Sequence, residues 1–274
     1  VSAVESKTDK NPNILVILID DAGYNDFGFM GSKEMQTPNI DALTSEGVVF
    51  TDAHVAATVS SPSRACLITG RYGHRFGYEC NLSDRTNGLP LEEETIAEVF
   101  KTNGYRTAAI GKWHLGSRDE QHPNNRGFDL FYGMKAGGRD YFYNEKKSDR
   151  PGDERNLLLN DRQVKFEKYL TDAFSEKAVE FINESSQPFM MYLAYNAVHT
   201  PMQATDEDMA KFEGHPRQKL AAMTYALDRG VGTVIRGLKD SGKFDNTLIF
   251  FLSDNGGATT NQSSNYPLKG FKGN

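Results

Sequence analysis

The chain has 274 residues, of which 38% are hydrophobic and 25% charged, as in an ordinary folded globular protein. Its formal net charge of -6 argues against a nucleic-acid-binding surface. The longest apolar run, residues 14–19, is far below the roughly 18 residues that a membrane-spanning helix needs. We therefore expect one large globular domain, with no nucleic-acid partner and no membrane span.

Two features bear on the compartment in which the protein works. Residues 1–11 are polar, lack the hydrophobic core of a signal peptide and begin with Val rather than Met, which favours a mature end left after signal cleavage over a cytosolic start. Cys66 and Cys80 could pair, but Cys66 falls in a predicted helix, so we favour a buried free thiol over a disulfide.

Apolar runs of strand length alternate with helical patterns along the chain. Strands are predicted at residues 13–19, 48–50, 106–110, 189–195 and 247–252. Helices are predicted at residues 38–46, 91–103, 171–183 and 217–241. This alternation predicts an α/β fold, with a large, mostly parallel central sheet flanked by helices on both faces. Residues 116–162 show no clear periodicity and predict a long, partly ordered surface excursion.

Acidic residues follow two of the predicted strands. Asp20 and Asp21 come directly after the first, and Asp254 and Asn255 follow the last. Each pair alone fits an ordinary solvated turn. Because the carboxyl ends of parallel strands meet at one edge of a sheet, the two pairs can instead converge on one divalent cation. Their oxygen ligands suit calcium or magnesium, whereas zinc would need His or Cys.

Residues 60–70, with the sequence SSPSRACLITG, combine hydroxyl groups, Pro and Arg at a predicted helix start. Pro62 favours the first helical turn, which places Ser60 just before free N–H groups that stabilise an anion. Arg64 adds a cation one turn further on. From these features alone, a Ser-rich cap on an ordinary helix fits better than an active site.

The same segment resembles the signature of type I sulfatases, which reads Cys or Ser, any residue, Pro, any residue, Arg, and then Thr-Gly. In that family the first residue is oxidised to formylglycine, whose hydrated aldehyde is the nucleophile, and Ser60 occupies its position. Cys is the usual occupant. The resemblance therefore implies that a formylglycine-generating or Ser-type maturation enzyme serves the protein, or that Ser was placed in a Cys enzyme to trap substrate.

Further motifs match the family in the expected order. The resemblance implies a Ca²⁺ site, with Mg²⁺ as the less favoured ion, whose ligands are Asp20, Asp21, Asp254, Asn255 and residue 60. It implies that the catalytic residues are Ser60, Arg64, Lys112, His114, His199 and Lys272. Singly, each could be a solvated charge or a structural His; together they match in register.

The resemblance also implies a reaction cycle. The metal and the cations at 64, 112 and 272 neutralise the sulfate, and one hydroxyl of the formylglycine hydrate, bonded to Asp254, attacks sulfur. His199 protonates the departing alcohol while Lys272 lies beside it, and His114 then takes the proton of the second hydroxyl so that sulfate leaves. An unmodified Ser60 lacks that second hydroxyl and could be sulfated only once.

The substrate is indicated less directly. The chain is similar to periplasmic or secreted sulfatases of marine bacteria that act on algal galactans such as carrageenan. Arg139 lies among aromatic residues in the segment 137–143, a pattern that fits either sugar and sulfate binding or a folded loop with packed aromatics. Lys112, His199 and Lys272 are the expected inner substrate contacts, and His122, Arg139 and Arg150 the outer ones.

The family's fold is an alkaline-phosphatase-like sandwich, and its members continue into a smaller C-terminal subdomain. We expect residues 1–274 to form the N-terminal catalytic domain, with that subdomain beyond residue 274. Two other functions stay open. A phosphate or phosphonate monoester hydrolase of the wider superfamily would need a His-rich, zinc-like site, and His199 lacks a nearby partner of that kind. An unmodified Ser60 would leave a protein that only binds sulfated glycan.

Overall fold

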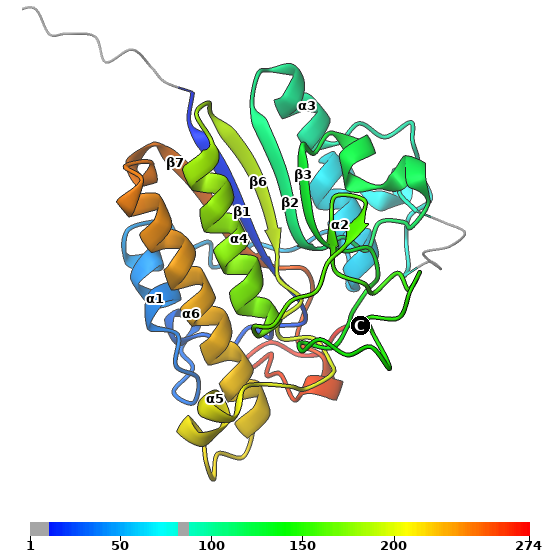
Figure 1. The fold of residues 1–274 in the computed structure, drawn as a ribbon. Coiled ribbons are helices and arrows are strands. Elements are labelled where there is room, and N and C mark those ends of the chain that lie inside the picture. Colours follow the sequence, from blue (N-terminus) through cyan, green and yellow to red (C-terminus); the bar gives the residue numbers. More distant parts are fainter. Residues whose placement is uncertain (1–10, 82–87) are drawn as a thin grey trace, which may run out of the picture.

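The computed structural model describes residues 11–81 and 88–274, so the predicted polar start at residues 1–10 lies outside it. The core is a seven-stranded sheet in the order β5-β4-β3-β2-β6-β1-β7 (Figure 1). The five strands from β3 to β7 in this order are parallel, whereas β4 pairs antiparallel with both β3 and β5. The strands are β1 (Asn13–Ile19), β2 (Arg106–Lys112), β3 (Leu130–Met134), β4 (Leu158–Leu159), β5 (Arg162–Gln163), β6 (Phe189–Ala194) and β7 (Thr247–Ser253).

Helices cover both faces of the sheet, as predicted. The helices are α1 (Pro38–Ser45), α2 (Ser60–Thr69), α3 (Ile96–Thr102), α4 (Leu170–Glu184), α5 (Asp206–Lys211) and α6 (Gln218–Asp240). In Figure 1, α1, α4 and α6 lie on one side of the sheet, and α2 and α3 on the other. Side chains of β1 alternate between two buried clusters accordingly. Leu15 and Ile17 pack in the α4 and α6 cluster, and Val16 and Leu18 in the α2 and α3 cluster.

Three predicted elements differ in the structure. Residues 48–50 form no strand, and Val48 and Phe50 are 79% and 75% exposed. Three apolar residues are too few to show a period, so the run did not distinguish a strand from an extended loop. The helix predicted from residue 91 begins at Ile96, because Thr95 forms a capping box with Glu98. Strands β3 and β4 lie within the predicted surface excursion at residues 116–162, and β5 begins at its last residue.

The cysteines agree with expectation. Cys66 is buried, Cys80 is exposed, and both are free thiols. Among residues 11–81 and 88–274, none of the helices combines the length and the hydrophobicity required to cross a lipid bilayer.

Candidate active site

The carboxyl ends of β1 and β7 lie side by side and present the predicted acidic residues together. The two strands are paired in register up to Ile19 and Ser253, and the N–H of Asp254 donates to the carbonyl of Ile19 at 2.9 Å. Asp20 and Asp254 are fully buried. Because burial of unpaired carboxylates is costly, these residues need cations close by.

Asp21 stands at the centre of the acidic cluster. Its backbone is left-handed, with φ at 61°, and its carbonyl accepts hydrogen bonds from Asn261 Nδ2 at 3.1 Å and Ser263 Oγ at 3.0 Å. Asp20, Asp21 and His199 each offer a possible ligand atom, and these atoms lie within 4.8 Å of one another. Asn255 Nδ2 donates to Asp21 Oδ1 at 2.8 Å. These side chains form a group that could hold a metal ion.

Ser60 is the first residue of α2 and points into this cluster. Its Oγ lies 3.2 Å from Asp20 Oδ1 and 3.1 Å from Asn255 Oδ1, and the residue is only 1% exposed. Pro62 fits the first turn of the helix, as predicted, since a residue there donates no main-chain hydrogen bond within the helix. The helix N-terminus therefore directs residue 60 towards the acidic oxygens.

Three basic side chains are each paired with one of the three carboxylates. Arg64 donates to Asp254 Oδ2 through Nε at 3.1 Å and Nη2 at 2.8 Å. Lys112 Nζ lies 2.7 Å from Asp20 Oδ2 and 3.5 Å from Ser60 Oγ. Lys272 Nζ lies 2.7 Å from Asp21 Oδ1. The formal charges of these six side chains therefore cancel.

The two histidines are held differently. Burial, together with the positive charges of Lys112 and Arg64, holds the pKa of His114 well below its usual value, so the ring is neutral near neutral pH. His199 Nδ1 lies 2.7 Å from the carbonyl of Thr200, which fixes the proton on Nδ1, and its Nε2 lies 3.8 Å from Asp21 Oδ2. His114 can accept a proton, and a protonated His199 can donate one from Nε2.

Burial by itself raises the pKa of Asp20, but the charges of Lys112, His199 and Arg64 outweigh it and hold the carboxylate below its usual pKa. Burial likewise lowers the pKa of Lys112, against the attraction of Asp20. The structure thus brings the three carboxylates, Ser60, Asn255 and the three basic side chains together, with His199 beside them.

The outer predicted contacts are placed elsewhere. Arg139 is 2% exposed, and its Nη2 donates to both oxygens of Asp149 at 2.8 Å. Its guanidinium also lies 4.6 Å from the centre of the Phe166 ring. This pairing neutralises the charge of Arg139 within the folded loop, and its predicted role in substrate binding stays a prediction. An Arg among aromatic residues gives the same sequence pattern whether it binds a sulfated sugar or packs within a folded loop.

His122 and Arg150 contact residues of their own loops. His122 is buried, accepts a hydrogen bond from the N–H of Asn124 at 3.3 Å and packs edge-on against Phe131 at 5.1 Å. Arg150 is exposed and donates to the carbonyl of Lys146. His122 therefore also serves the packing of its loop, whereas Arg150 keeps an accessible guanidinium.

Two features of the site went unrecognised in the sequence. Asn261 Nδ2 bridges the carbonyls of Asp21 and Val198, at 3.1 and 2.9 Å. Gly137 and Gly138 lie against the rings of His114 and His199, where an added Cβ would stand 2.6 and 3.2 Å from ring atoms. Asn261 lies in a polar loop without a motif, and the glycine pair belongs to a segment whose pattern indicates only a possible sugar-binding role.

The family model for sulfatases matches residues 12–274. The chain belongs to the sulfatase family. It is 34% identical over 308 residues to the uncharacterized sulfatase YdeN of Escherichia coli (strain K12), covering 92% of this chain and 53% of that protein. It is 36% identical over 274 residues to arylsulfatase J of Mus musculus, covering 96% and 45%. The chain thus spans about half the length of these curated relatives.

Two solved structures of Ps i-CgsB are also similar to the chain. They are 44% and 45% identical to it, with TM-scores of 0.90 and 0.91, and each match covers 96% of this chain and 63% of the other. The first was determined in complex with k-i-k-neocarrahexaose. This agreement confirms the alkaline-phosphatase-like α/β fold of the sulfatases that the sequence predicted.

Proposed function

We propose that the protein hydrolyses sulfate esters of a sulfated polysaccharide or oligosaccharide, and that an algal galactan such as carrageenan is the favoured substrate. One observation carries the proposal. Ser60, at the signature position, lies within a buried cluster of three carboxylates and three cations, in a sulfatase-family chain. The carrageenan assignment is supported by the 44% identity to Ps i-CgsB, which was crystallised with a neocarrahexaose.

We propose Ca²⁺ as the metal, with Mg²⁺ as the less favoured ion. The donor set fits a hard cation, because carboxylate and carboxamide oxygens of Asp20, Asp21, Asp254 and Asn255 are brought to one edge of the sheet beside residue 60. His199 contributes the only ring nitrogen of the acidic group, which does not suit zinc. A bound cation would supply positive charge to a sulfate ester.

Charge balance explains why a cation is needed. Asp20, Asp21 and Asp254 already neutralise Arg64, Lys112 and Lys272, so the side chains alone leave no net positive charge for a sulfate. A dication held by these carboxylates would offset their charge and leave Lys112 and Lys272 available to bind sulfate oxygens. Arg64 keeps a second anchor, because its Nη1 donates to the carbonyl of Lys112 at 3.1 Å.

The histidines divide the proton transfers. His199 is held by the Thr200 carbonyl so that Nε2 faces the cluster, and in its protonated form it donates to the departing alcohol. His114 is kept neutral by burial and the nearby cations, and it accepts a proton at residue 60. Formylglycine at position 60 supplies the hydrated aldehyde that acts as nucleophile.

Two partners follow from this proposal. A formylglycine-generating or Ser-type maturation enzyme oxidises residue 60, and the sulfated carbohydrate is the substrate. We further propose a periplasmic or secreted bacterial location, where such a polymer is accessible.

The experiment measures sulfate release from carrageenan oligosaccharides by the purified protein, together with the mass of the tryptic peptide that carries residue 60. The proposal predicts an aldehyde at residue 60 and released sulfate, both absent from S60A. An intact hydroxyl combined with saturable oligosaccharide binding would indicate the glycan-binding form. Faster hydrolysis of phosphate or phosphonate monoesters than of sulfate esters would contradict the proposal.

A further inference from the structure

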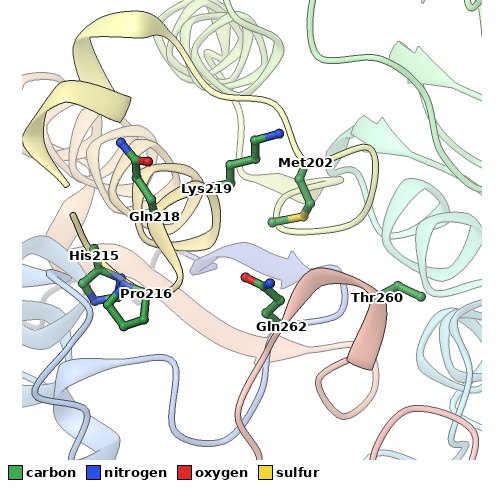
Figure 2. A pocket seen from close by; sticks show the side chains of 7 residues that line it. All are labelled: Met202, His215, Pro216, Gln218, Lys219, Thr260 and Gln262. Atoms are coloured by element: carbon green, nitrogen blue, oxygen red, sulfur yellow. The ribbon is translucent and has the colours of Figure 1, made fainter. Parts of the chain in front are cut away.

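A hollow with a volume of about 370 Å³ is lined by seven side chains, among them residues close in sequence to His199 and Asn261 (Figure 2). It is framed by the segment after His199, by the start of α6 and by the loop that contains Asn261. Its lining includes Met202, His215, Pro216, Lys219, Thr260 and Gln262. None of the roles assigned above uses these residues.

The hollow shares its walls with the catalytic centre. Thr260 and Gln262 flank Asn261, whose side chain holds the carbonyls of Asp21 and Val198. Met202 follows His199 by three residues, on the other side. A ligand group in the hollow would therefore lie next to a group bound at the acidic cluster, since the same short segments contact both.

The lining offers hydrogen-bond donors and a positive charge. The N–H of Arg217 donates to His215 Nδ1 at 3.0 Å, so a neutral His215 carries its proton on Nε2 and can donate to a ligand. Lys219 is exposed and has no ion-pair partner in the part of the chain that the structure describes. Of the described residues, those that line the hollow include no acidic one, whereas Met202 and Pro216 add apolar surface.

Arg217 links the segments around this hollow, and its own positive charge is neutralised by Asp26 and Glu34. Its guanidinium donates to Asp26 Oδ1 at 2.8 Å, to Glu34 Oε2 at 2.7 Å and to the carbonyl of Gln262 at 3.1 Å. Asp26 in turn accepts from the N–H of Ser264 at 3.1 Å. The start of α6 and the loop beyond Asn261 are therefore fixed to each other, and Lys219 supplies the charge left for a ligand.

We propose that this hollow is a subsite for the sugar next to the one whose ester is cleaved, and that this neighbouring sugar carries an anionic group, most simply a second sulfate. Lys219 and His215 bind the anionic group, while Met202 and Pro216 pack against the ring. The proposal rests on the proposed function, because it assumes a sulfated oligosaccharide at the acidic cluster.

The test compares a sulfated carrageenan tetrasaccharide with a small aryl sulfate as substrates of the wild type, K219A and K219R. We expect K219A to raise KM for the tetrasaccharide about tenfold with kcat unchanged, and K219R to restore most of the loss. The aryl sulfate has no second sugar to place in the hollow, so its kcat/KM should stay at the wild-type value. K239A is the matched control, since Lys239 lies at the far end of α6 and pairs with Glu46 at 3.5 Å.

An unchanged tetrasaccharide KM in K219A, or equal losses on both substrates, would overturn the subsite. Absence of turnover on both substrates in the wild type would instead overturn the proposed function. In that case calorimetry still tests the subsite, because K219A should weaken tetrasaccharide binding about tenfold relative to K239A. If K219A weakens only the binding of inorganic sulfate, the hollow is a simple anion site and the subsite is refuted.

Discussion

The hydroxyl of Ser61 donates a hydrogen bond of 2.7 Å to the main-chain carbonyl of His114. Tyr78 lies on the other side of that hydroxyl, with its Oη 2.7 Å from Ser61 Oγ. Arg64 makes a parallel contact to the carbonyl of Lys112. The helix that begins at Ser60 thus fixes the loop that carries the lysine and the histidine of the site.

Removing this hydroxyl should disturb catalysis more than folding. We expect S61A to lower kcat about tenfold with little change in KM, because a buried hydrogen bond contributes roughly 1 kcal/mol and His114 loses its fixed position. Steady-state kinetics on an aryl sulfate measures the effect, and thermal unfolding of S61A checks the fold. Y78F, which leaves the bond to His114 intact, should lose less. A wild-type kcat in S61A would show that the contact does not position His114.

The acidic cluster should be stabilised by a divalent cation. Binding of Ca²⁺ to the native state alone adds about 2.7 kcal/mol at a hundredfold excess over its dissociation constant, so Tm should rise on adding Ca²⁺ and fall with EDTA. Differential scanning fluorimetry measures this without any turnover. D21N should lose most of the Ca²⁺-dependent shift, whereas D245N, at an exposed position before β7, should keep it. An identical Tm with EDTA and with Ca²⁺ would argue against a metal site here.

Asp228 on α6 should be a stability residue remote from catalysis. Its buried carboxylate accepts hydrogen bonds from the main-chain N–H groups of Asn39 at 3.2 Å and Ile40 at 2.8 Å, and from Asn39 Nδ2. Since these groups belong to the first turn of α1, D228A leaves buried donors unpaired and should lower the free energy of unfolding by about 2–3 kcal/mol. Chemical denaturation measures the loss. The kcat of the folded fraction should stay unchanged; a loss below about 0.5 kcal/mol would contradict this account.

Two glycines in the left-handed region of φ should respond differently to alanine. Gly111 in β2 has φ at 105°, and an added Cβ would stand 1.9 Å from the carbonyl oxygen of Ala194 in β6. Gly104 has φ at 82° and open space around it. G104A should cost about 1 kcal/mol from strain alone, whereas G111A should cost several kcal/mol, because the central strands must separate. Comparable denaturation midpoints for the two variants would refute this distinction.

The elements and site residues that could be predicted each have a strong pattern in their local sequence. The apolar run of β1 and the acids that follow it indicate a buried parallel strand with a ligand-binding end, and the pairing of β1 with β7 then brings Asp20 and Asp254 together. Ser60 and Pro62 likewise mark the start of α2 in the sequence.

The parts that were not predictable depend on packing between distant segments. The contact of Ser61 with His114 and the bridging by Asn261 become visible only when loops meet in space. The pairing of Arg139 with Asp149 was equally hidden, because Asp149 lies ten residues away in a loop without periodicity. Strand β3 was missed since a five-residue run ending in Gly and Met gives little strand signal.

The most direct test of the central claim compares the conversion of residue 60 to formylglycine with the rate of sulfate release. The protein is matured with a formylglycine-generating or Ser-type enzyme, and the same sample is assayed for the aldehyde at residue 60 by peptide mass and for sulfate release from a carrageenan oligosaccharide. We predict that the rate of sulfate release rises in proportion to the fraction of residue 60 converted to aldehyde, and that S60A releases none. Sulfate release from S60A, or none from a fully converted sample with Ca²⁺ present, would contradict the assignment of residue 60 as the nucleophile of a sulfatase.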